Sequence, residues 1–323
     1  MPVIVSSVGD TARAFAQAAE QFFDNLAQLR LGSLGIALAL FGLYQLARSR
    51  ASFNALRAAY PDEEFAWRKI WGAYVAAFGL NGVVPAGGGS VVQLVLTRNT
   101  IRGSSFSTVT SGLCVGILFD AVVCTGVLIF AFTQGVFPKP ADFGGLSSFD
   151  IAFFGRHPSF TLFLVTALAV LGLAIFAVLS RRIAAFWSDL RQGWAILGDR
   201  RRYLTGMCLP QLCGWILRGA AYYYLLDAFR VGATVSAAIL VLAVQVIAAI
   251  VPFTPGGAGV QQALLVVIFS STAPTDSVAV FAVGQQIALL AFSLLQGFAA
   301  IFFIFQYRSF RAVLRDSRAA HAR

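Results

Sequence analysis

The chain has 323 residues, of which 58% are hydrophobic and 12% are charged, with a formal net charge of +10 and a mean hydropathy of +0.77. Because about 25% of the residues of soluble domains are charged, this composition excludes an ordinary soluble protein and predicts a polytopic membrane protein. The arginines gather at the ends of apolar runs, which is typical of topology signals and lipid contacts, so the positive charge does not indicate a nucleic-acid partner.

Residues 1–30 are expected to form an N-terminal interfacial or amphipathic segment. Apolar side chains recur there at helical spacing, with charged residues between them. A soluble helix packed on a loop is the open alternative. A signal peptide is not expected, since no basic start is followed by an apolar stretch.

Apolar runs follow along the chain and are expected to form helices. They cover residues 31–47, 70–84, 91–96, 106–132, 160–179, 204–226, 233–251, 260–269 and 278–305. Since about 20 helical residues span a bilayer, most runs qualify, whereas 91–96 and 260–269 are candidate half-helices. The predicted fold class is an all-α polytopic helix bundle, with one transmembrane domain over residues 31–306 and a basic cytoplasmic tail over residues 307–323.

Two gaps between these runs share one pattern of proline and glycine. The first reads Pro85-Ala86-Gly87-Gly88-Gly89 and the second reads Pro255-Gly256-Gly257-Ala258-Gly259. In lipid, an interrupted helix leaves backbone N–H and C=O groups unpaired, which is tolerated only where protein, a cavity or a ligand satisfies them. Paired interruptions in two halves of a chain therefore predict a binding site.

Charge placement predicts which loops are cytoplasmic. Basic residues gather in 48–69, 181–202 and 308–323, so these segments should be cytoplasmic. The loop 134–159 and the connection around Asp276 lack such an excess and should face outward. The expected location is the cytoplasmic membrane, with the N-terminus outside and the C-terminus inside.

This orientation gives the two glycine breaks opposite polarity. Residues 70–96 would enter and leave on the cytoplasmic side, and residues 233–269 on the outer side. The two glycine-tipped hairpins would point at each other, either as re-entrant hairpins or as crossing pairs. With the long helix that follows each, they predict an inverted repeat of residues ~66–133 and ~233–306.

The glycine tips are candidate sites for an anionic group. Glycine lets a ligand approach the main chain closely, and the N-terminus of the helix that follows favours negative charge. We expect the head of an anionic phospholipid or of a polyprenyl phosphate there. The candidate substrate-binding residues are Pro85, Gly87, Gly88, Gly89, Ser90, Gln93, Pro255, Gly256, Gly257, Gly259, Gln261, Gln262 and Arg218. The alternative is that the glycines only allow helices to pack closely.

Two ionisable residues, Asp120 and Arg218, lie deep within apolar runs. Such groups are costly in lipid and are usually paired or functional. We expect them either to pair with each other or to divide two tasks, with Asp120 coupling transport to a proton or ion and Arg218 binding phosphate. A structural ion pair that fixes helix register is the open alternative.

Cysteine and histidine usage predicts neither a metal nor a cofactor. The cysteines at 114, 124, 208 and 213 lie in apolar runs without a C-x-x-C motif and are expected to be packed thiols. The two histidines are too few for a histidine-based metal site.

Four features of the sequence occur together: Asn81-Gly82-Val83-Val84-Pro85-Ala86-Gly87-Gly88-Gly89, Ser104-Ser105-Phe106-Ser107, Asp120 and Pro252-Phe253-Thr254-Pro255-Gly256-Gly257-Ala258-Gly259-Val260. In these features the sequence resembles the lysylphosphatidylglycerol synthase transmembrane, or flippase-like, domain family. The resemblance implies an integral membrane protein that moves modified lipids or lipid-linked sugars, with Asp120 matching the family's intramembrane aspartate. Many relatives carry charged residues where this chain has Gly87, Ser90, Gly116 and Gln262.

We therefore expect a membrane transporter that flips an anionic lipid or a lipid-linked intermediate, with membrane lipids as partners and no catalytic residues. Two other classes stay open. One is a membrane enzyme that processes polyprenyl phosphates, although residues 255–260 offer none of the acids, serines, arginines or histidines it needs. The other is a non-catalytic partner of a lipid-modifying or glycosyl-transferring enzyme.

Overall fold

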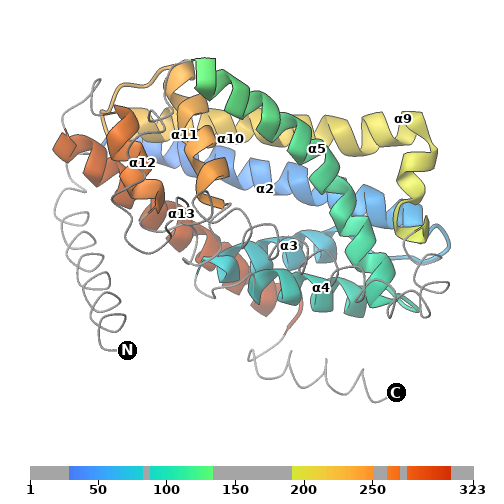
Figure 1. The fold of residues 1–323 in the computed structure, drawn as a ribbon. Helices are drawn as coiled ribbons and strands as arrows, with labels where there is room; N and C mark the ends of the chain where they lie inside the picture. Colours follow the sequence, from blue (N-terminus) through green and yellow to red (C-terminus); the bar gives the residue numbers. More distant parts are fainter. Residues whose placement is uncertain (1–28, 83–87, 134–190, 250–259, 270–274, 307–323) are drawn as a thin grey trace, which may run out of the picture.

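The computed structural model describes residues 29–82, 88–133, 191–249, 260–269 and 275–306, and its described elements are all helical (Figure 1). The first half contains α2 (Leu31–Ala59), α3 (Trp67–Asn81), α4 (Gly88–Thr100) and α5 (Phe106–Thr133). The second half contains η3 (Ala195–Gly198), α9 (Arg200–Tyr203), the π-helical turn η4 (Leu204–Cys208), α10 (Leu209–Ala228), α11 (Val235–Ala249), α12 (Val260–Phe269) and α13 (Thr275–Phe303). The prediction of an all-α membrane bundle is confirmed at this level.

Several sequence predictions lie outside the described residues. These are the N-terminal segment up to residue 28, the loop 134–159, the run 160–179, the tail from residue 307, and the tips of both glycine breaks at 83–87 and 250–259.

In the described part of the chain, three helical segments are long and apolar enough to cross a membrane, judged by length and composition. They are Leu31–Ala59, Phe106–Ala131 and Ser277–Phe303. The helices beside the glycine breaks are shorter, with 15 residues in α3, 13 in α4, 15 in α11 and 10 in α12. At 1.5 Å per residue, none of these four covers a hydrocarbon core of about 30 Å over the residues that the structure describes.

Helices α2 and α10 lie side by side along their whole length and run antiparallel (Figure 1). At one end, Asp227 of α10 accepts hydrogen bonds from Arg30 at 2.6 Å and from Ser33 at 2.5 Å. At the other end, the Asn54 amide donates to the carbonyl of Gly206, in the π-turn, at 2.7 Å. This long contact fixes which face of α10 points into the bundle.

Helix α13 packs against α3, again antiparallel, because small residues let the backbones touch. A Cβ at Gly79 would lie 2.6 Å from the Ser293 carbonyl oxygen, and one at Gly297 would lie 3.2 Å from that of Val75. A side chain at Gly79 would require the backbone to shift, whereas one at Gly297 would make a tight contact, and small residues of this kind are common between membrane helices. Figure 1 shows α3 and α4 toward one end of the bundle and α11 and α12 toward the other.

Helix α4 folds back onto α3 directly after the first glycine break. The Gly89 N–H donates to the Asn81 side-chain oxygen at 3.0 Å, and a Cβ at Gly89 would lie 2.1 Å from the Ala77 carbonyl oxygen. At Gly89, therefore, the absence of a side chain is required by packing. This supports the packing alternative for that glycine.

Candidate functional site

A cavity of about 220 Å³ lies where residues next to both glycine breaks approach the middle of α13. Asn81 and Gly82 come directly before the first break, and Gln261 comes directly after the second. We call it the central cavity; its lining residues are Phe41, Phe78, Asn81, Gly82, Arg218, Tyr222, Gln245, Gln261, Gln285, Gln286, Leu289, Leu290 and Ser293.

The two breaks approach neighbouring turns of α13. A Cβ at Gly82 would lie 2.3 Å from the Leu290 side chain, so the end of α3 touches α13 at that residue. One turn earlier on α13, the Gln286 side chain accepts a hydrogen bond from the Gln262 amide of α12. Segments far apart in the sequence are therefore brought to one place.

Some of the buried polar atoms without a partner belong to residues that line this cavity. Gln285 is 0% exposed and Ser293 is 2% exposed. Both amide atoms of Gln285 and the Ser293 hydroxyl lack a hydrogen-bond partner in the part of the chain that the structure describes. Because a buried polar group without a partner costs free energy, a polar guest in the cavity could lower that cost at Gln285 and Ser293.

Arg218 brings a positive charge to the cavity wall. Its guanidinium carbon lies 5.6 Å from the Tyr44 ring, 5.6 Å from the Trp215 ring and 5.9 Å from the Tyr222 ring. Aromatic rings attract a cation but supply no counter-charge. Within the described helices no carboxylate forms a salt bridge with Arg218, and its buried Nε has no hydrogen-bond partner.

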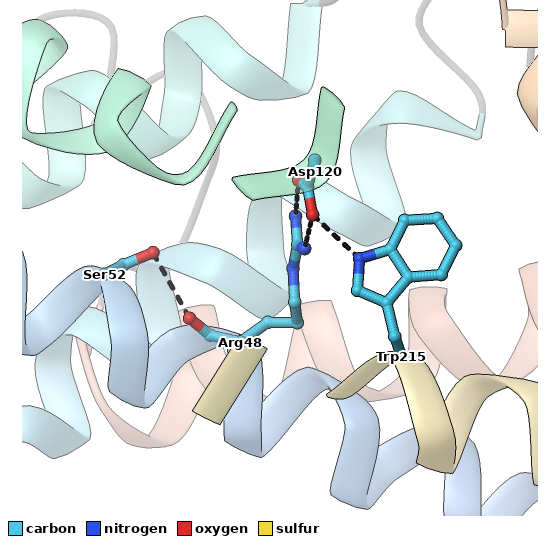
Figure 2. A network of polar contacts seen from close by, with 4 residues as sticks. All are labelled: Arg48, Ser52, Asp120 and Trp215. Atoms are coloured by element: carbon cyan, nitrogen blue, oxygen red, sulfur yellow. Dashed lines mark hydrogen bonds and ion pairs between the residues drawn. The ribbon is translucent and has the colours of Figure 1, made fainter. Parts of the chain in front are cut away.

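A second group of charges lies beside the cavity, and we call Arg48, Asp120 and Trp215 the carboxylate cluster (Figure 2). The Asp120 carboxylate accepts hydrogen bonds from both terminal nitrogens of Arg48, one of them at 2.6 Å, and one from the Trp215 indole N–H at 2.9 Å. The Arg48 and Asp120 side chains are 19% and 22% exposed. Figure 2 also shows the Ser52 hydroxyl donating to the Arg48 carbonyl, at 3.3 Å.

The carboxylate cluster rules out one sequence interpretation of Asp120. The alternative in which Asp120 and Arg218 pair with each other is wrong, because Asp120 pairs with Arg48. Arg48, the first residue of the basic segment 48–69, lies inside α2. Helix α2 continues through the basic residues to Ala59, so this arginine is carried along the helix to face α5.

The other predicted site residues fall into three groups. Gln261 is buried in the cavity wall, and Gln262 contacts it through Gln286. Gly88, Gly89, Ser90 and Gln93 form the start of α4, where Ser90 is exposed, and none of them lines the cavity. Pro85, Gly87, Pro255, Gly256, Gly257 and Gly259 lie outside the described residues.

Sequence reasoning missed several lining residues, namely Asn81, Gln245, Gln285, Gln286 and Ser293. All five lie in or beside long apolar runs. A glutamine inside a membrane helix is costly for the same reason as a charge, so the three glutamines could have been identified in the same way as Asp120.

One family model matches the chain. Its description is lysylphosphatidylglycerol synthase TM region, and it covers residues 7–297. That range contains both glycine breaks, the carboxylate cluster and every lining residue of the central cavity. No curated protein matches the chain.

Proposed function

We propose that this chain, which belongs to the lysylphosphatidylglycerol synthase transmembrane-region family, moves an anionic lipid or lipid-linked intermediate between the leaflets of the membrane. Its apolar helices and its family make it a multi-pass membrane protein. The single observation that carries the transport proposal is Arg218, a cation beside a cavity among membrane helices and without a salt-bridge partner in the described residues.

The argument rests on charge balance. Arg48 and Asp120 neutralise each other in the carboxylate cluster, which leaves Arg218 without a counter-charge among the described residues. An unpaired charge in a low-dielectric interior is expensive, and an anionic guest would remove that cost. A phosphate-bearing lipid head is the abundant anion at this location, and its acyl chains can stay in the surrounding lipid.

We further propose that the α3–α4 and α11–α12 pairs are re-entrant hairpins of an inverted repeat, entering from opposite leaflets. Their short helices support this, as does the approach of residues beside both breaks to one cavity. In transporters with inverted repeats the substrate binds near the midplane, and access alternates between sides. The N-terminus would then be outside and the C-terminus cytoplasmic.

Orientation can be tested by labelling single cysteines in a cysteine-free background of the whole chain. Arg102, between α4 and α5, and Val235, at the start of α11, are both exposed. With a membrane-impermeant thiol reagent on sealed cells, Val235→Cys should react from outside and Arg102→Cys only after lysis. Labelling of both from one side would contradict the inverted arrangement.

The role proposed for Asp120 is to couple lipid transport to the binding and release of a proton. Protonation of its carboxylate would release Arg48 and loosen the contact of α5 with α2. In this proposal the chain performs transport and no bond-breaking chemistry.

The direct test is reconstitution of the purified chain in liposomes that contain fluorescent phosphatidylglycerol. An impermeant quencher then reports how much label reaches the outer leaflet. We expect protein-dependent exchange that Arg218→Gln abolishes and Arg201→Gln, at an exposed helix arginine outside the cavity, leaves intact. Equal exchange in the Arg218 variant and the parent would overturn the proposal.

A further inference from the structure

The charge of the central cavity is one-sided. Arg218 is the only charged side chain in its lining among the described residues, and no aspartate or glutamate lies there. Residues 83–87 and 250–259, which lie close to the lining residues Gly82 and Gln261 in the sequence, contain no acidic residue either. A guest that carries an ammonium group would therefore meet an arginine and no counter-charge.

The Asp120 carboxylate, beside the cavity, cannot act as the counter-charge for an ammonium group in its present arrangement. Both oxygens of Asp120 accept hydrogen bonds from Arg48, and one accepts a further bond from Trp215. Recruiting Asp120 to an ammonium group would leave Arg48 without its partner. Breaking a buried pair in this way is strongly unfavourable.

The uncharged part of the wall is rich in groups that both donate and accept hydrogen bonds. Gln245, Gln261, Gln285 and Gln286 supply amides, and Ser293 supplies a hydroxyl. In Gln285 the amide nitrogen and oxygen are both buried without a partner among the described residues. A hydroxyl group likewise donates and accepts, so it can satisfy both atoms, whereas an ammonium group only donates.

We infer that the central cavity selects a lipid head with one negative charge, in a phosphodiester, and with uncharged hydroxyl groups, and that it rejects heads bearing an ammonium group. This inference rests on the proposed function and names its substrate class. Arg218 holds the phosphodiester, and the glutamines with Ser293 hold the hydroxyl groups. A glycerol or sugar head fits this description, and an aminoacylated or choline head does not.

The inference can be tested by thermal unfolding of the full chain in detergent with four short-chain lipids. Phosphatidylglycerol has one charge and hydroxyls, phosphatidic acid lacks the hydroxyls, and lysylphosphatidylglycerol and phosphatidylcholine carry cationic nitrogen. Since a ligand stabilises the folded state according to its affinity, phosphatidylglycerol should raise the unfolding temperature at about tenfold lower concentration than the others. Arg218→Gln should remove this shift and Arg201→Gln should preserve it.

A gain of specificity gives the sharper test. Gln285→Glu places a carboxylate in the cavity wall at almost unchanged volume. Lysylphosphatidylglycerol should then stabilise the variant at about tenfold lower concentration than it stabilises the parent, since a charged hydrogen bond is about twice as strong as a neutral one. Stabilisation by phosphatidylglycerol should become weaker than in the parent. Gln285→Leu should weaken the stabilisation by phosphatidylglycerol without increasing the stabilisation by lysylphosphatidylglycerol. If Gln285→Glu does not fold, Gln245→Glu makes the same test.

The outcomes separate this inference from the function it rests on. If lysylphosphatidylglycerol stabilises the parent as well as phosphatidylglycerol does, and Arg218→Gln removes both effects, the cavity is a lipid site but the selectivity is wrong. If stabilisation by every lipid is independent of Arg218, the selectivity and the proposed function both fail.

Discussion

Two arginines within the helical bundle, Arg48 and Arg218, differ in whether they form a salt bridge. Arg48 of α2 is neutralised by a bidentate bond to Asp120, whereas Arg218 of α10 is surrounded by aromatic rings and glutamines and has no salt-bridge partner in the described chain. Among the described residues, Asp120 pairs with the arginine that joins α2 to α5 and not with Arg218. Under the proposed function, Arg48 would serve the structure and Arg218 would serve a ligand.

The largest expected effect is on transport by Arg218→Gln. If this charge serves a ligand, its removal should lower lipid exchange to the level of protein-free vesicles while the unfolding temperature without lipid stays equal or rises, because an uncompensated charge is gone. The exchange assay and thermal unfolding measure the two effects. A loss of stability would mean that Arg218, like Arg48, serves the structure.

The largest expected effect on stability is that of Asp120→Ala. It leaves Arg48 without its counter-charge, so the free energy of unfolding should fall by about 3 kcal/mol. The double variant Arg48→Met with Asp120→Leu should recover most of this loss, as apolar replacements of buried pairs do. A single variant as stable as the parent would show that the cluster is not a structural pair.

Gly89→Ala tests how firmly the cavity wall is held. The new Cβ would lie 2.1 Å from the Ala77 carbonyl oxygen and would push α4 away from α3, next to Asn81. We expect a loss of about 2 kcal/mol in the free energy of unfolding, as for overpacked cores. Ser90→Ala, at the exposed neighbouring position, should change stability little. Wild-type stability of the Gly89 variant would contradict the close contact.

The smallest effect on stability is expected from Trp215→Phe, since Trp215 lies between Arg48 and Arg218 and its replacement keeps an aromatic ring. It removes the hydrogen bond to Asp120 and keeps an aromatic ring near Arg218. The free energy of unfolding should fall by about 1 kcal/mol, the usual worth of one hydrogen bond, with lipid binding retained. Loss of lipid binding together with unchanged stability would assign Trp215 to the cavity.

The helices were largely predictable from the sequence because apolar runs record where lipid and core surround the chain. The run 260–269 has the same bounds as α12, whereas α2 continues past the run ending at residue 47 as far as Ala59. Arg48, Arg50 and Arg57 lie within the continuing helix, beyond the apolar run. Basic residues at the end of an apolar run therefore do not mark the end of the helix.

The site was predictable only in part. Asp120 and Arg218 could be selected because an ionisable residue within an apolar run is costly wherever it lies, and Gln261 because it follows a glycine break at the start of a helix. Their partners could not be predicted from the sequence, because Arg48 and Asp120 are brought together only by the packing of α2 against α5. Likewise, the assembly of Asn81, Gln261 and Gln285 in one wall depends on how α3 and α12 approach α13.

Trp215 has a consequence for energetics, because its indole N–H binds Asp120 while its ring faces the Arg218 guanidinium. Any movement of this one side chain changes the surroundings of both charges. By thermodynamic reciprocity, a lipid that shifts the proton affinity of Asp120 tenfold would have its own affinity shifted tenfold by that proton. Through this one tryptophan, a proton gradient that changes the protonation of Asp120 would also change how strongly the cavity binds the lipid.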